Sequence, residues 1–366
     1  MNDDGWIDIY DAVTLAEASG TSGMPLSKAA LVYDSGWLDL TGLTGKGIDI
    51  IHNLGLDTSN LLVDARQRIP SWNQTYGRGS NEWSWPWSLV QTNDQGYALA
   101  GVAASYSDYN YDFWLLRTDA GGNAEWNKTY GGANEERAYD LTQTVDGGYV
   151  MAGSTSSYGA GSSDAWLLKT DQFGNMVLNR TYGGTGVDEA WSVIQTLEGG
   201  YVLAGSTDSY GAGGRDFWLV KTDTSGNAEW NGTYGGTENE WAFDVVQTLS
   251  GGYAIVGDTF SFGAGSRDCW FVKTDANGKM QSNKTYGGTG NDDAKSMILT
   301  SDGDYALGCT TTSFGTGNGD SWLIKTGDES GLAWHLTDNT ITLYKCETDP
   351  HWNYVRVRIL KRKQAP

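Results

Sequence analysis

Histidine is the scarcest chemically useful residue in this chain. Three histidines occur among 366 residues, and none lies between residues 70 and 327, so most of the chain lacks the side chain that most often moves protons near neutral pH. The same shortage argues against metal chemistry there. The histidines are His52, His335 and His351.

Cysteine is nearly as rare, with three residues: Cys269, Cys309 and Cys346. They form no Cys-x-x-Cys pair, which excludes a metal knuckle and a dense disulfide framework. Each stands where the surrounding pattern calls for a small or apolar residue. Packing and a single disulfide therefore remain as alternatives.

Positive charge and long apolar runs are also lacking. There are 24 basic against 45 acidic residues, and the net charge of −21 makes nucleic acid and anionic membranes unsuitable partners, while cations and neutral glycans stay possible. No apolar run reaches the length of a transmembrane helix. Met1 is followed by Asn-Asp-Asp rather than by a basic and then apolar leader, so either no such leader is used or the numbering starts inside a longer precursor.

What the chain does contain is a repeat. Glycine (51 residues), tyrosine (20) and tryptophan (17) favour short strands joined by tight turns. Thr-Tyr-Gly recurs with spacings of 54, 52, 52 and 52 at Tyr76, Tyr130, Tyr182, Tyr234 and Tyr286. Asp-x-Trp recurs with a constant spacing of 52 residues, at Trp114, Trp166, Trp218, Trp270 and Trp322.

Each copy predicts four strands, beginning with an inner strand and ending with the Trp-Asn-x-Thr-Tyr-Gly-Gly segment. Five copies predict an all-β fold with a five-bladed β-propeller over residues 70–327. The last copy ends after its third strand, so the entering segment 72–76 is expected to complete it and close the ring. The repeat resembles that of secreted archaeal and bacterial β-propeller proteins, which implies an extracellular location.

The flanks predict a second domain, a β-sandwich interrupted by the propeller. Its halves are residues 29–69, with strands expected at 32–40, 47–52 and 61–66, and residues 328–366, with strands at 331–335, 340–344 and 352–359. Asp-Ser-Gly-Trp, His-Asn-Leu-Gly and Val-Arg-Val-Arg-Ile resemble a β-sandwich module distantly like H-type lectins. That resemblance implies sugar binding or assembly.

Residues 1–28 form a separate segment. Its start resembles part of a dockerin-type calcium loop followed by a short helix, which implies Ca²⁺ as a ligand. The implied ligands are Asn2, Asp4, Asp8 and Asp11. The alternative is an acidic helix start, because aspartates favour the first turn.

Three sets of residues recur along the chain, each at its own position within the repeat. Asn-x-Thr sequons predict glycosylation of the outer strand edge, unless duplication alone preserved them, at Asn73, Asn127, Asn179, Asn231 and Asn283. A ring of acids could hold Ca²⁺ or only cap loops, and consists of Glu136, Asp188, Glu240 and Asp292. Aromatic residues could bind sugars or only fill the core, and are Trp87, Tyr139, Trp191 and Phe243, with Lys295 in the fifth copy.

These observations predict a non-catalytic extracellular or cell-surface glycoprotein, such as a filament or surface-layer subunit, with self-association or other surface proteins as partners. A carbohydrate-binding or adhesion protein is the alternative. A propeller glycoside hydrolase is a third possibility, because two carboxylates are enough for that chemistry. It requires an acidic pair that departs from the repeat, and no convincing acidic departure stands out.

Overall fold

The structure is a computed structural model, and it describes residues 6–14, 30–39, 64–66, 72–77, 82–105, 110–317, 319–327, 332–337 and 340–345. The chain folds into two compact units, Met1–Gln74 and Thr75–Pro366. The described residues contain strands and turns and no helix, so none of them offers a helix able to cross a membrane.

The first unit holds a three-stranded antiparallel sheet in the order β2-β1-β3. Its strands are β1 (Trp6–Thr14), β2 (Ala30–Asp39) and β3 (Asp64–Arg66). The last two match predicted strands, while the strand expected at 47–52 lies outside the described residues. β1 instead occupies part of the expected calcium loop and the beginning of its helix. The alternation of apolar and acidic residues in Trp-Ile-Asp-Ile-Tyr-Asp suits a strand equally well, and β1 pairs with β2 over nearly its whole length.

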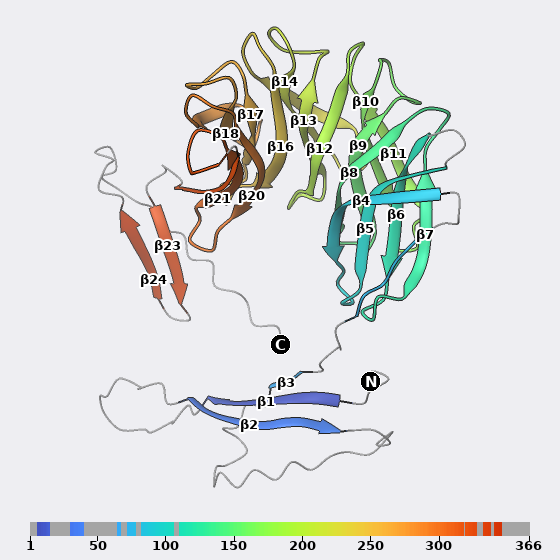
Figure 1. Ribbon diagram of the computed structural model, residues 1–366, viewed down its shortest axis with the longest axis vertical. Helices are drawn as coiled ribbons and strands as arrows, with labels where there is room; N and C mark the ends of the chain where they lie inside the picture. The colour runs from blue at the N-terminus through green and yellow to red at the C-terminus, as the bar shows by residue number, and fades with distance from the viewer. Residues whose placement is uncertain are drawn as a thin grey trace. The chain divides into compact units, whose positions relative to one another are not determined.

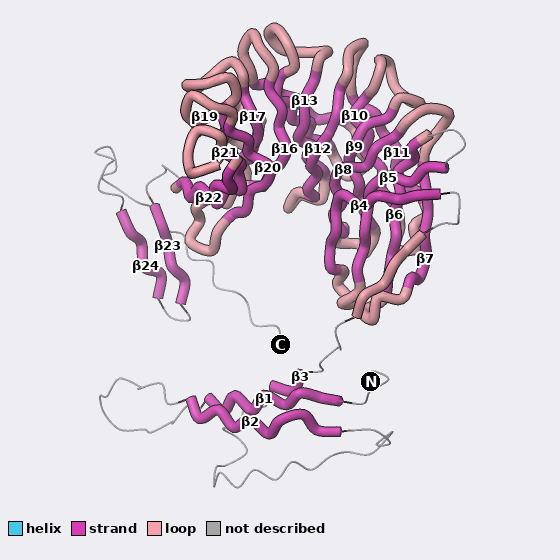
Figure 2. The backbone as a smooth tube through the Cα atoms, viewed as in Figure 1, coloured by secondary structure: helices cyan, strands magenta, loops and turns pink. Residues whose placement is uncertain are grey.

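Five further sheets follow in the second unit, each antiparallel and in sequence order (Figures 1 and 2). The first contains β4 (Glu82–Gln91), β5 (Tyr97–Ser105), β6 (Tyr111–Thr118) and β7 (Ala124–Tyr130). The second contains β8 (Glu136–Gln143), β9 (Tyr149–Thr155), β10 (Asp164–Thr170) and β11 (Met176–Tyr182). The third contains β12 (Asp188–Gln195), β13 (Tyr201–Thr207), β14 (Asp216–Thr222) and β15 (Ala228–Tyr234).

The fourth sheet contains β16 (Glu240–Gln247), β17 (Tyr253–Thr259), β18 (Asp268–Thr274) and β19 (Met280–Tyr286). The fifth has three strands, β20 (Asp292–Leu299), β21 (Tyr305–Thr311) and β22 (Asp320–Thr326), so the prediction that the last copy lacks its own outer strand is confirmed. A hairpin of β23 (Leu332–Thr337) and β24 (Thr340–Lys345) matches two predicted strands, and residues 352–359 lie outside the described part.

The hydrophobic core of the repeat lies between consecutive sheets rather than within one sheet. Separate clusters fill the gaps between the first and second sheets, the second and third, the third and fourth, and the fourth and fifth. The first strands of neighbouring sheets also contact one another, as β4 does β8 and β16 does β20 (Figure 1). Each sheet therefore depends on its neighbours to bury its faces.

In the first three sheets, a tyrosine of the outer strand hydrogen-bonds the next sheet. The Tyr130 hydroxyl donates to the Gly174 carbonyl at 2.7 Å, and Tyr182 and Tyr234 repeat the contact one and two sheets further on. Tyr76, which precedes the first sheet, donates to the Gly122 carbonyl at 2.7 Å in the same manner. Segment 72–77 is therefore anchored to the first sheet at its Tyr76 end in the way that the outer strands are anchored to their neighbours.

Every inner strand carries a β-bulge at the same phase. In the second sheet the register shifts between Ala138 and Asp140, and the other four sheets shift at the equivalent positions. Gly153 lies opposite, where an added Cβ would be 1.8 Å from the Arg137 carbonyl oxygen. Bulges re-aim side chains and often adjoin functional sites.

Candidate active site

The five bulge residues form a row of stacked side chains across the five sheets. Trp87 and Tyr139 lie 5.0 Å apart with planes 8° from parallel, and Tyr139 and Trp191 lie 3.9 Å apart at 15°. Trp191 meets Phe243 edge to face at 5.6 Å, and the Lys295 ammonium lies 3.7 Å from the centre of the Phe243 ring. We call these five residues the aromatic row. Its members are partly exposed, with Trp87 at 45%, which leaves ring surface available to a ligand.

The residue after each bulge alternates between serine and aspartate: Ser88, Asp140, Ser192, Asp244 and Ser296. The Asp140 carboxylate accepts from Ser88 Oγ at 3.0 Å and from the Val193 amide at 2.9 Å, which joins three sheets. Burial raises the pKa of Asp140 and of Asp244, and the Asp140 charge raises that of Asp244 further. This alternation was visible in the sequence at the 52-residue spacing but was not recognised there.

One carboxylate beside the aromatic row departs from the repeat. Asp258 in β17 occupies a phase that carries Val102, Ser154, Ser206 and Thr310 in the other copies. Its side chain is 1% exposed; Oδ1 accepts from the Ala294 amide at 2.9 Å, and Oδ2 lies 3.4 Å from Lys295 Nζ. Burial raises the pKa of Asp258 to about 7 with help from Asp293, although Lys295 opposes the shift. Asp258 therefore holds its proton close to neutral pH.

A second acid, Asp293 of β20, lies near Asp258 and has the opposite surroundings; its phase carries Arg137, Glu189 and Trp241 in the three preceding copies. Its carboxylate forms an ion pair with the guanidinium of Arg267, whose Nη2 donates to Oδ2 at 2.7 Å. Arg267 also lies over the Phe260 ring. A guanidinium stays charged and favours an ionised partner. A buried carboxyl group with a raised pKa thus neighbours a carboxylate that is paired with a cation.

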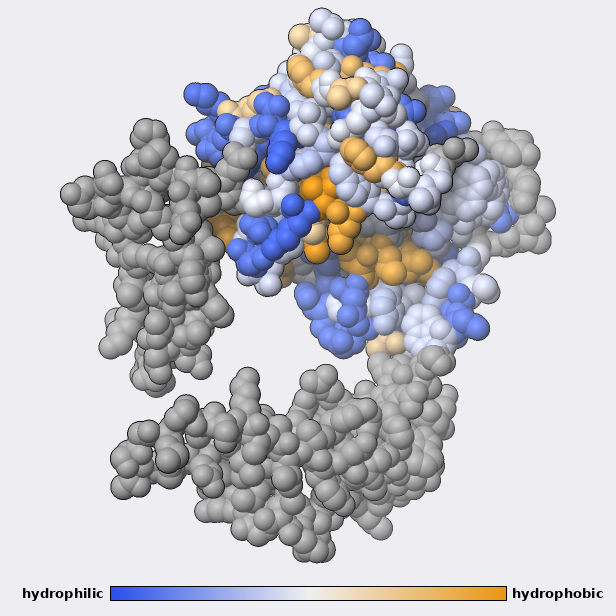
Figure 3. Space-filling view, turned by 60° about the vertical axis from the view of Figure 1, so that its left-hand side comes forward, coloured by the Kyte–Doolittle hydropathy of each residue, from blue (hydrophilic) through white to orange (hydrophobic). Residues whose placement is uncertain are grey.

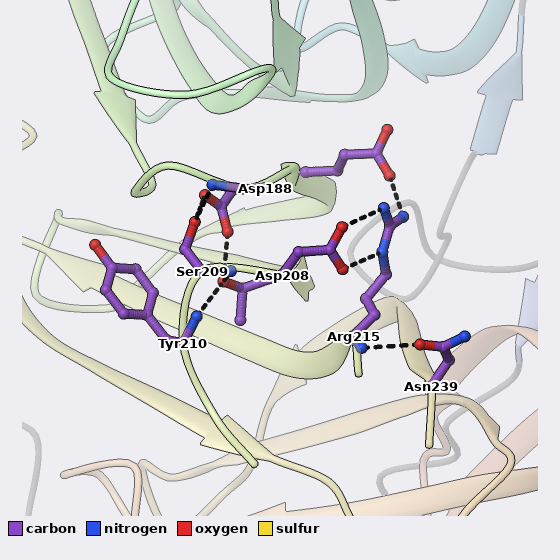
Figure 4. A network of polar contacts seen from close by, with 9 residues as sticks. Asp188, Asp208, Ser209, Tyr210, Arg215 and Asn239 are labelled. Atoms are coloured by element: carbon purple, nitrogen blue, oxygen red, sulfur yellow. Dashed lines mark hydrogen bonds and ion pairs between the residues drawn. The ribbon is translucent and has the colours of Figure 1, made fainter. Parts of the chain in front are cut away.

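A further ion network lies at the third sheet (Figure 4). The Arg215 guanidinium contacts both carboxylate oxygens of Asp208, at 3.0 and 3.1 Å, and donates to Glu189 at 3.0 Å. The Tyr139 hydroxyl of the aromatic row lies 3.4 Å from the same Glu189 carboxylate. The aromatic row is therefore bordered by ion pairs at the third, fourth and fifth sheets, and their acids and arginines recur at the same phases in two copies, as Glu189 and Asp293 and as Arg215 and Arg267.

The surface of the repeat is mostly hydrophilic, as expected from the acidic composition. Seen with the fifth sheet turned forward, hydrophobic side chains gather in a hollow between the sheets (Figure 3). Exposed apolar side chains of the fifth sheet include Ile298 and Leu323.

The four acids predicted to form a cation ring are completely buried and accept hydrogen bonds within their own sheets. Glu240 accepts from the Gly236 amide at 2.9 Å and from Thr259 Oγ1 and the Ser261 amide at 3.0 Å. Glu136, Asp188 and Asp292 have equivalent partners. These are the contacts of loop-capping residues, and the described ranges contain no group of three or more potential metal ligands. A cation role for them stays a prediction.

The predicted N-terminal calcium ligands are only partly described. Asp8 and Asp11 belong to β1, and Asn2 and Asp4 lie outside the described residues.

The sequon asparagines have a structural partner that sequence reasoning missed. Asn179 Oδ1 accepts from the indole Nε1 of the buried Trp166 at 2.6 Å, and Asn127, Asn231 and Asn283 bind the equivalent tryptophans. All five asparagines, including Asn73, are exposed. The pairing explains why asparagine persists at this phase without any glycan, while the exposure leaves glycosylation a prediction.

We expect Asn179→Ala to lower the free energy of unfolding by roughly 1–2 kcal/mol, because the Trp166 indole loses its acceptor. Thr181→Ala removes the same sequon but leaves the Asn179 side chain in place. Urea unfolding of unglycosylated protein measures both. Equal losses from the two changes would show that the hydrogen bond is unimportant.

Comparison with known proteins gives likeness at the level of structure alone. No family model and no curated protein matches the chain. Sqt1 from Chaetomium thermophilum has a TM-score of 0.38 and 12% identity over 71% of this chain and 68% of its own. An endo-1,5-α-L-arabinanase from Thermotoga petrophila has 0.34 and 12% over 70% and 72%. A mannose phosphorylase from Leishmania mexicana has 0.32 and 10% over 68% and 84%.

Two of these three structures are enzymes that act on sugars, as their names state. They contradict the prediction of a non-catalytic structural glycoprotein, and we abandon it. No convincing acidic departure from the repeat was recognised in the sequence, whereas Asp258, in the second strand of its sheet, is one. At these TM-scores the likeness assigns no activity, so the function must be argued from the residues.

Proposed function

We propose that the protein is a glycoside hydrolase whose active site lies at the Phe243 and Lys295 end of the aromatic row. The observation that supports this most strongly is Asp258, a buried carboxyl group with its pKa raised to about 7, beside Asp293, whose carboxylate is ion-paired with Arg267. Glycoside hydrolysis needs two carboxyl groups in two protonation states, and environments that separate them identify the acid and its partner.

In the proposed reaction Asp258 donates its proton to the glycosidic oxygen as the leaving group departs. Asp293 acts on the other side of the sugar, either by attacking the anomeric carbon or by taking a proton from the attacking water. Lys295 is the exposed contact of the buried Asp258, and its side chain is about half exposed. We expect Lys295 to move when substrate binds, because only then can a sugar reach the acid.

The aromatic row gives the site a surface for sugar rings. Because Trp87, Tyr139 and Trp191 stack on one another, the row offers mainly the exposed edges of its rings as apolar surface, while the polar groups of the ion network bordering the row can bind hydroxyl groups. The row crosses all five sheets, which favours a substrate of several sugar units over a monosaccharide glycoside. Release of reducing sugar from a panel of neutral polysaccharides and oligosaccharides tests the proposal. No release from any of them at pH 5–7 would count against it.

The pH dependence of the rate is a separate prediction. Because Asp258 must be protonated to act and its pKa is raised to about 7, we expect kcat to fall about tenfold per pH unit above that value. Initial rates with one substrate from pH 5 to pH 9 measure this fall in kcat. A rate that is constant to pH 9 would remove Asp258 from the acid's role.

We also propose that the five sheets close into a five-bladed propeller, with segment 72–76 as the outer strand of the fifth sheet. The bond of Tyr76 to Gly122 supports this, and so does Leu323 of β22, which is 76% exposed where its counterpart Leu167 is buried. Amides along β22 should then exchange with solvent as slowly as those of β18. Rapid exchange along β22 alone would contradict closure.

The resemblances to secreted propeller repeats, to an H-type lectin-like sandwich and to a dockerin segment remain predictions, as do export, Ca²⁺ binding and occupied sequons. Intact mass of protein from its native source tests the sequons. A mass equal to that of the bare chain would exclude their occupation.

A further inference from the structure

Cys269 and Cys309 meet in the core between the fourth and fifth sheets. Cys269 belongs to β18 and Cys309 to β21, and both are buried in the cluster that joins these sheets. Their thiols are in hydrogen-bonding contact with each other. Two cysteines from different sheets therefore face each other within one buried cluster.

Both cysteines depart from the repeat, and they do so as a pair. The phase of Cys309 carries glycine in the other four copies: Gly101, Gly153, Gly205 and Gly257. The phase of Cys269 carries Phe113, Ala165, Phe217 and Ser321. Between the first and second sheets the same two phases face each other as Phe113 and Gly153, where a Cβ on the glycine would lie 2.7 Å from Phe113 Cζ. The fourth and fifth sheets replace a large residue and a glycine by two cysteines.

Paired substitution is not what packing alone requires. A smaller residue at the first phase could be accommodated with glycine opposite, as Ala165 and Gly205 show between the second and third sheets. Adding a side chain at the glycine phase works against the close approach seen in the other sheets, where any Cβ would meet the backbone of the inner strand. What the side chain at residue 309 adds in return for this steric cost is a sulfur atom opposite the sulfur of Cys269.

We propose that Cys269 and Cys309 form a disulfide that links the fourth and fifth sheets. The oxidant is an external disulfide, such as glutathione disulfide or that of a thiol oxidoreductase. One protein thiolate attacks it and releases a thiol, and the other then attacks the mixed disulfide and releases the second thiol. Two S–H bonds are lost, one S–S bond forms in the protein, and two electrons reduce the external disulfide to two thiols.

The two sulfurs differ in readiness for this step. The hydrogen bond from Cys269 lowers the pKa of Cys309, while the same bond and burial raise that of Cys269. Cys309 is therefore the sulfur that ionises first and attacks first. Because both are buried in the folded protein, we place the reaction late in folding, when the two thiols are already in contact but the external disulfide can still reach them.

The disulfide would also fix the proposed catalytic acids relative to each other. Cys269 is the cross-strand partner of Asp258, and Cys309 is the partner of Ala294, whose amide binds Asp258 and whose neighbour is Asp293. This consequence rests on the proposed function, whereas the disulfide itself does not.

Peptide mapping of full-length protein tests the bond. The protein is refolded with glutathione disulfide, denatured without reductant, alkylated and digested. We expect one linked peptide pair containing residues 269 and 309, with Cys346 alkylated. Alkylation of both Cys269 and Cys309, or a bond from either to Cys346, would overturn the proposal.

The matched control restores the pair found between the first and second sheets, Cys269→Phe with Cys309→Gly. Reductant should lower the Tm of the oxidised wild-type protein by about 5–10 °C, because the bond closes a loop of some forty residues, and leave the Tm of the double variant unchanged. An equal effect on both proteins would refute the link. A mapped disulfide in a protein without hydrolase activity would refute the proposed function alone.

Discussion

Asp258→Asn should lower kcat about 10²- to 10⁴-fold, the range expected when a general acid is lost. An amide has no proton to give to the glycosidic oxygen, yet it keeps the oxygen that accepts from the Ala294 amide, so the fold should be maintained. Initial rates below pH 7, where the wild-type acid holds its proton, measure the full loss. Substrates with highly acidic leaving groups should be affected least, because they depart without protonation.

Asp302→Asn is the control for this change. Asp302 lies in the fifth copy and, like Asp258, pairs with a lysine, Lys325, but it lies in an exposed turn away from the aromatic row. We expect its rate to equal that of the wild type. If Asp258→Asn keeps wild-type activity with a good leaving group and a poor one alike, Asp258 is not the acid.

The raised pKa of Asp258 also predicts how the free energy of unfolding depends on pH. The folded protein prefers the protonated form, since its pKa is about 7 against 3.8 in an exposed aspartate. The stability that this preference supplies is complete below about pH 4 and is lost as the pH rises through 7. Asp258→Asn removes this dependence because an amide does not titrate.

Glu240→Ala should cost about 3 kcal/mol or more in the free energy of unfolding. The change leaves the Gly236 amide and the Thr259 hydroxyl without their acceptor in a buried loop and the Ser261 amide with Thr259 Oγ1 alone, and each unsatisfied donor costs about 1–3 kcal/mol. Urea unfolding followed by tryptophan fluorescence measures the loss.

Glu238→Ala is the matched control, because this exposed acid lies in the same loop and only its backbone amide is bound, to Ser261 Oγ. It should change stability by less than about 0.5 kcal/mol. Added Ca²⁺ should leave the Tm of both variants and of the wild type unchanged. A Ca²⁺-dependent rise in the wild type that Glu240→Ala abolishes would instead support the cation ring.

The sequence predicts strands well here because each copy repeats the same turns. Gly147 has a φ of +82°, and its amide closes a turn on the Thr144 carbonyl; the equivalent glycines can be found from the 52-residue spacing alone. The spacing also predicts correctly that the fifth sheet lacks an outer strand. The segment 6–14 was harder, since alternating aspartates and apolar residues fit both a calcium loop and a strand; the structure has it as β1, paired with β2, and the calcium site stays a prediction.

The candidate site was less predictable because its residues come from different phases of different copies. Asp258, Asp293 and Lys295 are separated by up to 37 residues and meet only through the packing of two sheets. Asp258 was visible as an acid among valine, serine and threonine, but its burial was not. The Asn179 to Trp166 bond was likewise hidden, because it depends on the register of β10 and β11.

The hydrophobic clusters between the sheets also determine where unfolding should begin. The second, third and fourth sheets each share a cluster with both neighbouring sheets, whereas the first and fifth sheets each share one; the first sheet carries in addition the small cluster of Ala103, Trp114 and Leu116, against which Tyr76 packs. Unfolding of stacked units starts where nearest-neighbour support is weakest. The fifth sheet, which carries Asp293 and Lys295, has the least support until segment 72–76 closes the proposed ring, so we expect that closure to open first. Access of substrate to the buried Asp258 and the resistance of the repeat to unfolding would then both depend on the packing of the fifth sheet.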